Sequence, residues 1–240
     1  MNDLVRERFR LKETIVTITA QVRDQIEAAK EEIAFQRDLL EEFIRGDPFF
    51  VLTLEPYDRA IDEAPQIVRD MVRAGASVGI GPMSAVAGTI AKFALEAMIR
   101  AGASCAIVDN GGDVALVCDR PVLMGIYAGS SPLKNLAFEI PPRDRPLGIC
   151  TSSGTVGPSI SFGYADAAVV VSEDVSLADA AATALGNAVG ENSPLAEAFG
   201  AVDQPGIAGA MVIRGEEMAL WGELPPLKRA NLRPDLITRG

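Results

Sequence analysis

The chain has no histidine among its 240 residues. This absence excludes histidine-based catalytic triads, histidine-ligated zinc and acid–base catalysis by imidazole. The three cysteines are an odd number without a C-x-x-C spacing, which argues against a disulfide framework or a zinc site and indicates buried structural thiols. Any chemistry must therefore rest on carboxylates, hydroxyls, thiols, lysines, backbone groups or a hard cation.

Long apolar runs and basic clusters are also missing. No stretch approaches the roughly 20 uninterrupted apolar residues that cross a bilayer, and residues 1–10 carry alternating charges where a signal peptide needs an apolar run. We therefore expect a cytoplasmic protein without membrane contact. A net charge of −11 disfavours nucleic acid as a partner. A phosphorylated ligand would have to draw positive potential from backbone N–H groups and a metal ion.

The composition is that of a globular protein, with 48% apolar and 23% charged residues. Strand-like and helical patterns alternate without a repeat or a low-complexity linker, so the sequence predicts a mixed α/β (α+β) fold in one compact body. The length suits a single domain over 1–240 or two closely fused halves. The proline-containing stretch 223–240 is expected to be an extended surface tail.

The apolar spacing predicts one long helix over 21–45, ended by Gly46 and the Asp47-Pro48 step. One stripe of this helix should pack onto a sheet, and it consists of Val22, Ile26, Ile33 and Leu40. Further helices are expected at about 63–73, 83–100 and 177–189, strands at 13–19, 49–54, 104–108, 114–118, 122–127, 167–171, 209–213 and 218–221, and loops at 141–146 and 148–163. Ser176 is the expected N-cap of the last helix.

Two glycine-rich segments are candidate binding elements. The turn from Gly79 to Ser84, which includes Gly81, opens a helix and could cradle a phosphate; a small-residue packing face is the alternative. In the turn Asn110-Gly111-Gly112-Asp113, the glycines would let a ligand approach the backbone. Asp113 could accept hydrogen bonds from a ribose or an adenine amino group. A plain hairpin turn is the alternative for this second segment.

A carboxylate and a hydroxyl form a third candidate. Asp179 and Thr183 lie at i and i+4 of a predicted helix, so their side chains project from one face. Two hard oxygen donors so placed can share Mg²⁺ or Ca²⁺. The alternative is that Asp179 neutralises the helix N-terminus after a Ser176 cap while Thr183 bonds back within the helix. The spacing alone leaves both interpretations open.

These segments, taken in order, resemble the ApbE-like superfamily. Its flavin transferase members carry a Ser-x-x-Ala-Lys-Gly segment, a Gly-Gly-Asp turn, a Thr-Ser-Gly step and an Ala-Asp-x-x-x-Thr helix. The matching stretches here are 84–88, 111–113, 151–154 and 178–183. The resemblance covers about residues 83–189 and is to a short prokaryotic branch without the lipoprotein signal.

The resemblance implies a site for Mg²⁺ and for FAD or FMN. The metal would be held by Asp179, Thr183 and the Ala87 carbonyl. A flavin or another nucleotide would contact residues of the four segments, namely Gly81, Ser84, Asn110, Gly111, Gly112, Asp113, Thr151, Ser152, Ser153, Gly154 and Thr155. For the serine- and threonine-rich stretch from Thr151, an ordinary surface loop is the alternative.

Two departures from the transferase pattern limit what it implies. Gly88 stands where transferases carry lysine, with Lys92 the nearest substitute, and the histidine that follows their Thr-Ser-Gly step is absent. Ligand binding is therefore easier to infer than flavin transfer. The resemblance implies an accessory factor in sulfur assimilation and homocysteine formation of anaerobes. A second copy of the chain in a homo-oligomer or a pathway protein is a possible partner, and the sequence does not fix the oligomeric state. An active Mg²⁺-dependent FMN transferase or FAD pyrophosphatase is one alternative, and a degenerate relative without a ligand is another.

Overall fold

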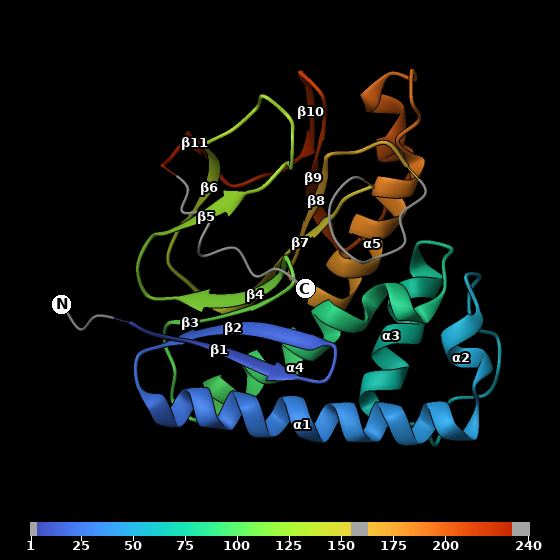
Figure 1. Ribbon diagram of the computed structural model, residues 1–240, viewed down its shortest axis with the longest axis vertical. Coiled ribbons are helices and arrows are strands. Elements are labelled where there is room, and N and C mark those ends of the chain that lie inside the picture. Colours follow the sequence, from blue (N-terminus) through green and yellow to red (C-terminus); the bar gives the residue numbers. More distant parts are fainter. Residues whose placement is uncertain (1–3, 155–162, 232–240) are drawn as a thin grey trace.

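A computed structural model describes residues 4–154 and 163–231 (Figure 1). Eight strands form one antiparallel sheet in the order β1-β2-β3-β4-β7-β8-β9-β10, and a second sheet has the order β11-β6-β5. The strands are β1 (Val5–Leu11), β2 (Thr14–Ala20), β3 (Ala106–Asn110), β4 (Asp113–Cys118), β5 (Val122–Ile126), β6 (Leu136–Ile140), β7 (Arg143–Ser152), β8 (Ala167–Ser172), β9 (Ile207–Arg214), β10 (Glu217–Gly222) and β11 (Leu227–Arg229).

Helices cover one face of the large sheet, and the small sheet covers part of the other face (Figure 1). The helices are α1 (Arg23–Gly46), α2 (Phe49–Leu52), α3 (Gln66–Ser77), α4 (Val86–Arg100) and α5 (Val175–Ala188), with 3₁₀ turns η1 (Pro82–Ala85) and η2 (Leu195–Ala201). This is the mixed α/β body that the sequence predicts.

The large sheet has a separate apolar core on each face. Because side chains alternate along a strand, Val108 and Ala115 face the helices while Leu116 faces the small sheet. Phe138 and Ile140 of β6 close the second core from the small sheet. Strand β8 is buried at every position because both of its faces are covered.

Helix α1 packs the predicted stripe against the sheet and α4. Ile26 and Ile33 are fully buried and Leu40 is 5% exposed, as the helical spacing predicts. Val22 is the exception, because it precedes the first helical turn and is 49% exposed. The helix ends at Gly46, the residue expected from the sequence.

The strand predicted over 49–54 is wrong, since the chain forms α2 there. Asp47 Oδ1 accepts a hydrogen bond from the Phe49 amide at 3.1 Å, which closes a turn around Pro48. Pro48 itself has helical dihedral angles. Within α2 only Phe50 is buried, and its ring meets Phe43 edge-on at 5.2 Å. The local turn chemistry therefore outweighs the β-branched and aromatic composition of this stretch.

The predicted loops at 141–146 and 148–163 are wrong for the part occupied by β7. Gly148 lies inside this strand. A glycine is needed there because the first residue of α5 packs against it, and a Cβ on Gly148 would lie 2.8 Å from Val175 Cα. The glycine therefore marks a close helix–strand contact. The sequence interpretation also misses β1 and β6, and the tail contains β11, which pairs with β6.

One helical stretch, Pro82–Arg100, is long and apolar enough to cross a membrane by length and composition. In the fold it packs in the core against α1, α5 and the large sheet, and 61% of it is buried. Its apolar character therefore follows from its place in the core.

Candidate functional site

The first contact of the candidate site joins the start of α4 to α5. Asp179 on α5 is 6% exposed, and its Oδ2 accepts a hydrogen bond from the Gly88 backbone amide at 2.7 Å. The Ala87 amide also donates to this carboxylate. Asp179 thus caps α4 from a neighbouring helix, because the first amides of a helix have no partner within it.

The glycine turn between β3 and β4 forms the second part. Asn110 ends β3, and its Nδ2 donates a hydrogen bond to the Ala87 carbonyl at 3.0 Å. Gly111 and Gly112 follow with φ angles of +71° and +108°, which other residues rarely adopt. The Gly112 amide donates to Asp109 Oδ1 at 2.9 Å. This turn therefore places Asp113 beside the start of α4.

Strand β7 brings Thr151 next to the same turn. The pairing of Val114 with Ile149 carries β7 alongside β4, and a Cβ on Gly112 would lie 3.8 Å from the Thr151 carbonyl oxygen. The Thr151 amide donates a hydrogen bond to the Asp113 carboxylate. Segments from β3, β4, β7, α4 and α5 therefore meet here.

Two acidic side chains, Asp113 and Asp179, lie close enough at this meeting point for the charge of one to act on the other. Loss of hydration, and then the charge of Asp109, raise the pKa of Asp113 to about 7. Burial, and then the charge of Asp113, raise the pKa of Asp179 well above its usual range. No lysine or arginine of the described chain is among the groups that shift either pKa. A cation here would stabilise both ionised carboxylates.

Cys150 is a buried neighbour of the two carboxylates. It is fully buried, its thiol is 3.8 Å from the Val175 carbonyl oxygen, and it also hydrogen-bonds Asp113. Burial, and then the charges of Asp113 and Asp179, raise the pKa of this thiol well above its usual range. Cys150 is therefore a neutral thiol that supports Asp113.

The oxygen atoms around Asp179 could supply some, but not all, of the ligands of a hard cation. Thr183 is half-buried one turn after Asp179, on the same side of α5. Among the described residues, no group of three His, Cys, Asp or Glu side chains could hold a metal ion. A cation would thus need hydroxyl, carbonyl, water or ligand oxygens. The Ala87 carbonyl already accepts the Asn110 amide, so a cation there would have to share or replace that hydrogen bond.

The remaining predicted residues do not all join this group. Ser84 Oγ donates to the Gly81 carbonyl at 2.6 Å and the Gly81 amide donates to Leu54, so these bonds only shape the turn before α4. Ser152 is buried in β7, and the Ser153 hydroxyl and Gly154 amide bind the Ala165 carbonyl. Thr155 lies outside the described residues.

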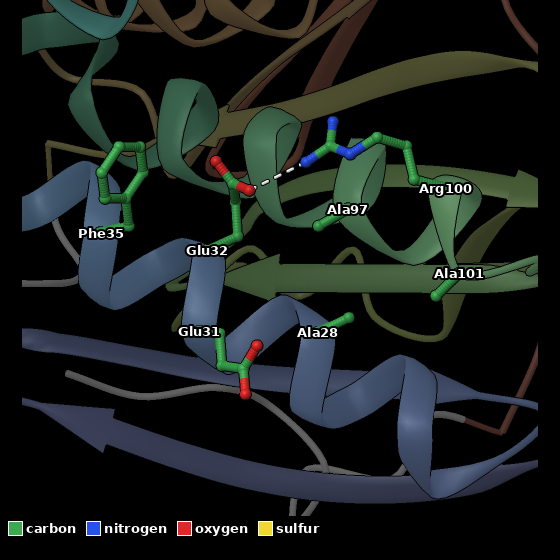
Figure 2. Close-up of a pocket in the computed structure, with 7 residues that line it drawn as sticks. All are labelled: Ala28, Glu31, Glu32, Phe35, Ala97, Arg100 and Ala101. Carbon is green, nitrogen blue, oxygen red and sulfur yellow. Dashed lines mark hydrogen bonds and ion pairs between the residues drawn. The ribbon is translucent and has the colours of Figure 1, made fainter.

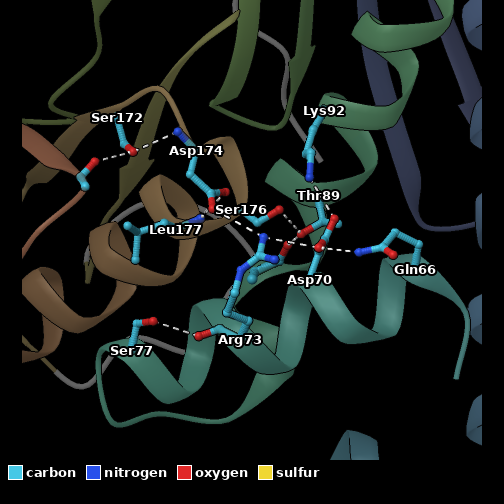
Figure 3. Close-up of polar contacts among 12 residues, drawn as sticks. Gln66, Asp70, Arg73, Ser77, Thr89, Lys92, Ser172, Asp174, Ser176 and Leu177 are labelled. Atoms are coloured by element: carbon cyan, nitrogen blue, oxygen red, sulfur yellow. Dashed lines mark hydrogen bonds and ion pairs between the residues drawn. The ribbon is translucent and has the colours of Figure 1, made fainter. Parts of the chain in front are cut away.

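The predicted Ser176 cap of α5 is wrong. Asp174 is the N-cap, and its carboxylate accepts the Leu177 amide at 3.2 Å. Ser176 lies inside the helix, where its Oγ accepts a hydrogen bond from Thr89 of α4 at 2.9 Å (Figure 3). Asp174 takes the cap because it stands directly before the first helical residue.

Lys92, the nearest substitute for the missing transferase lysine, binds a carboxylate on α3. Its Nζ is 2.7 Å from Asp70 Oδ2 on α3, and the Asp70 side chain is 2% exposed. Asp70 also binds Gln66 at 2.8 Å and Arg73 at 3.1 Å (Figure 3). The ammonium group of Lys92 therefore neutralises a buried carboxylate on α3.

The sequence interpretation missed Asp109 and Cys150 as neighbours of the site, whereas the small-residue packing face that it offered as an alternative fits Gly88. A Cβ on Gly88 would lie 2.6 Å from Asp179 Cβ and 3.0 Å from the Val175 carbonyl oxygen. Asp109 directly precedes the turn Asn110-Gly111-Gly112-Asp113, so the sequence could have indicated that it lies near the site. The need for glycine at position 88 arises only from the contact between two helices.

Two surface hollows lie elsewhere, and neither contains Asp113 or Asp179. One, of about 540 Å³, is bordered by Ser104, Cys118 and Arg143. The other, of about 450 Å³, lies between α1 and α4, where Glu32 and Arg100 form an ion pair at 2.8 Å beside the exposed Phe35 ring (Figure 2).

Comparisons with known proteins identify the family of the chain. Residues 2–203 match the family model described as AbpE bacteria. A UPF0280 protein of Methanothrix thermoacetophila is 57% identical over 237 residues, covering 99% of this chain and 100% of that protein. A UPF0280 protein of Methanosarcina acetivorans is 58% identical, covering 98% of this chain and 93% of that one.

Solved structures share the fold at low sequence identity. The apo form of the flavinyl transferase ApbE of Pseudomonas stutzeri superposes with a TM-score of 0.60 and 12% identity, covering 99% of this chain and 98% of that one. A flavin transferase ApbE of Vibrio cholerae gives a TM-score of 0.50 with 13% identity, covering 91% and 97%. The chain therefore belongs to the AbpE bacteria family and is an ApbE-like protein similar to the UPF0280 proteins of methanogens.

Proposed function

We propose that this chain binds FAD or FMN together with Mg²⁺ where the start of α4, the glycine turn and α5 meet. One observation carries the proposal: Asn110 and Asp179 hold the carbonyl of Ala87 and the amide of Gly88 from opposite sides. This joins segments that are 23 and 91 residues apart in the sequence. Two solved structures that share this fold are a flavinyl transferase and a flavin transferase.

The charge of the site supports a metal-dependent mode of binding. The chain carries a net charge of −11, and two carboxylates with raised pKa values stand at the meeting point. Asp179 would be the dominant ligand, with Thr183 and the Ala87 carbonyl as further ligands. Bound Mg²⁺ would neutralise these carboxylates and attract the phosphates of a nucleotide.

The space around Gly88 favours binding over flavin transfer. A Cβ on Gly88 would overlap Asp179 Cβ, so the helices leave no room for a lysine at the position where transferases carry one. Lys92, one turn further, is bound to Asp70. Among the described residues, neither position 88 nor Lys92 then supplies a cationic side chain for a reacting phosphoryl group. A carrier or accessory subunit fits this better than a transferase does, and its place in sulfur assimilation stays a prediction.

The proposal is tested with purified protein. After loading with FAD and Mg²⁺ and removal of free ligand, denaturation should release flavin, detected by its absorbance and identified by chromatography. Release of AMP from FAD in the presence of Mg²⁺ would instead support the transferase or pyrophosphatase alternative. A protein that retains no flavin under any of these conditions would support the degenerate relative and contradict the proposal.

A further inference from the structure

The two edges of the large sheet differ in chemistry. In β1 the arginines Arg6, Arg8 and Arg10 alternate with partly buried residues and are all exposed on one face. In β10 the corresponding exposed positions include Met218, which is 40% exposed, and Leu220, which is 52% exposed. Charged side chains protect an edge strand from pairing with another chain, whereas an apolar edge invites pairing.

We propose that a second copy of this chain pairs antiparallel with β10 across a two-fold axis, joining two sheets into one. In the described part of the chain, β9 is the only strand that pairs with β10, so its outer edge ends the sheet (Figure 1). Antiparallel addition of a strand satisfies that edge with backbone hydrogen bonds. A two-fold axis makes the contact self-complementary and closed.

Both faces of β10 carry apolar surface that a second copy would cover. Met218 and Leu220 pair with Ile213 and Met211 of β9, so they lie on the face of the second core and continue it outward. On the opposite face, Trp221 stacks on Phe199 with ring centroids 6.4 Å apart and stays half-buried. A neighbouring strand would remove apolar side chains from water on both faces.

The charges on the two edge strands, β1 and β10, favour self-pairing of β10 over self-pairing of β1. A register centred on Ala219 places Met218 opposite Leu220 of the second copy and sets no two charges opposite each other. The charged residue of β10, Glu217, is bound by Arg214 at 2.5 Å. Self-pairing of β1 in any register that matches its faces would set arginine against arginine, which is destabilising.

The test uses the full chain and measures its mass by sedimentation equilibrium across a dilution series. Trp221 is the single tryptophan, so its emission reports burial of β10 in the same samples. We expect a dimer at high concentration, with blue-shifted Trp221 emission that reverts on dilution. Leu220→Lys and Met218→Lys should each raise the dissociation constant at least about tenfold while circular dichroism stays unchanged.

Leu123→Lys is the matched control, because Leu123 is 56% exposed on β5 at the edge of the small sheet. It should leave the dissociation constant unchanged. A wild-type chain that stays monomeric throughout the series would overturn the proposal. A dimer that is weakened by Leu123→Lys but not by Leu220→Lys would overturn it as well.

Discussion

The carboxylate of Asp179 accepts a 2.7 Å hydrogen bond from the amide of Gly88, although 91 positions separate the two residues. The bond fixes the start of α4 against α5 and gives the first amides of α4 the partner that the helix itself cannot supply. It also keeps a buried carboxylate next to Asp113. The contact therefore couples the stability of the helix pair to the chemistry of the proposed site.

Gly88→Ala should separate the two helices. The added Cβ would lie 2.6 Å from Asp179 Cβ, and neither neighbouring backbone can move freely in the core. We expect a loss of about 1 to 3 kcal/mol in the free energy of unfolding, measured by urea denaturation. Gly46→Ala is the control, since nothing lies within 4 Å of a Cβ there. Equal effects of both substitutions would contradict the close contact.

Asp113→Asn should change how stability depends on pH. The pKa of Asp113 is raised from 3.8 to about 7 in the folded chain, so the folded state holds the proton more tightly than the unfolded state. The stabilisation this provides is lost as the pH rises from about 3.8 to about 7.

The melting temperature of the wild type, relative to Asp113→Asn, should therefore fall over that pH range. Differential scanning calorimetry of both proteins measures it. Mg²⁺ should stabilise the wild type more above this range than below it, because ionised Asp113 then adds negative charge next to the proposed metal ligand Asp179. A difference between the two proteins that does not vary with pH would show that Asp113 titrates normally.

Much of the fold follows from the sequence because the signals are local. The apolar spacing of α1 predicts its buried stripe, and Gly46 marks its end. The strand at β8 is a short apolar run, as expected for a strand covered on both faces. The order of the four motif segments predicts an ApbE-like body, which the family match confirms.

The rest depends on contacts between distant segments. Nothing near Lys92 in the sequence indicates that Asp70 of α3 binds it. Gly148 suggests a loop until α5 is seen to begin above it. Asp174 and Ser176 are both good helix caps, and only the backbone geometry decides between them. Secondary-structure propensities and residue spacing describe one segment at a time, so they cannot predict contacts between distant segments.

Asp70→Ala should destabilise the helix layer strongly. The substitution removes the partner of Lys92, Gln66 and Arg73 from a site where the carboxylate is 2% exposed. Loss of one partner from a buried ion pair costs about 3 kcal/mol, measured by chemical denaturation. Glu139→Gln, which breaks the exposed pair with Lys228, should cost less than about 1 kcal/mol. Comparable losses would show that the Asp70 cluster is no stronger than a surface ion pair.

Thr183→Val tests whether the hydroxyl binds the cation. Valine keeps the branched shape of the side chain and removes its oxygen donor, so Mg²⁺-dependent flavin affinity should fall about tenfold while the melting temperature changes little. Thr183→Ser retains the hydroxyl and should keep most of the affinity. Fluorescence titration of flavin measures both variants. If Val and Ser bind equally, Thr183 is not a ligand.

Calorimetric titration of FAD and of FMN, with and without Mg²⁺, into the wild type and Asp179→Asn tests the central claim most directly. Asparagine keeps the shape of the side chain and removes its charge, and Asp47→Asn serves as the control because the Asp47 carboxylate also accepts a hydrogen bond from a backbone amide, that of Phe49. We predict that Mg²⁺ increases the flavin affinity of the wild type and the control, and that Asp179→Asn loses this increase at least about tenfold while remaining folded. Equal flavin affinity of all three proteins, with or without Mg²⁺, would show that Asp179 only caps α4 and would contradict the proposed metal-assisted binding.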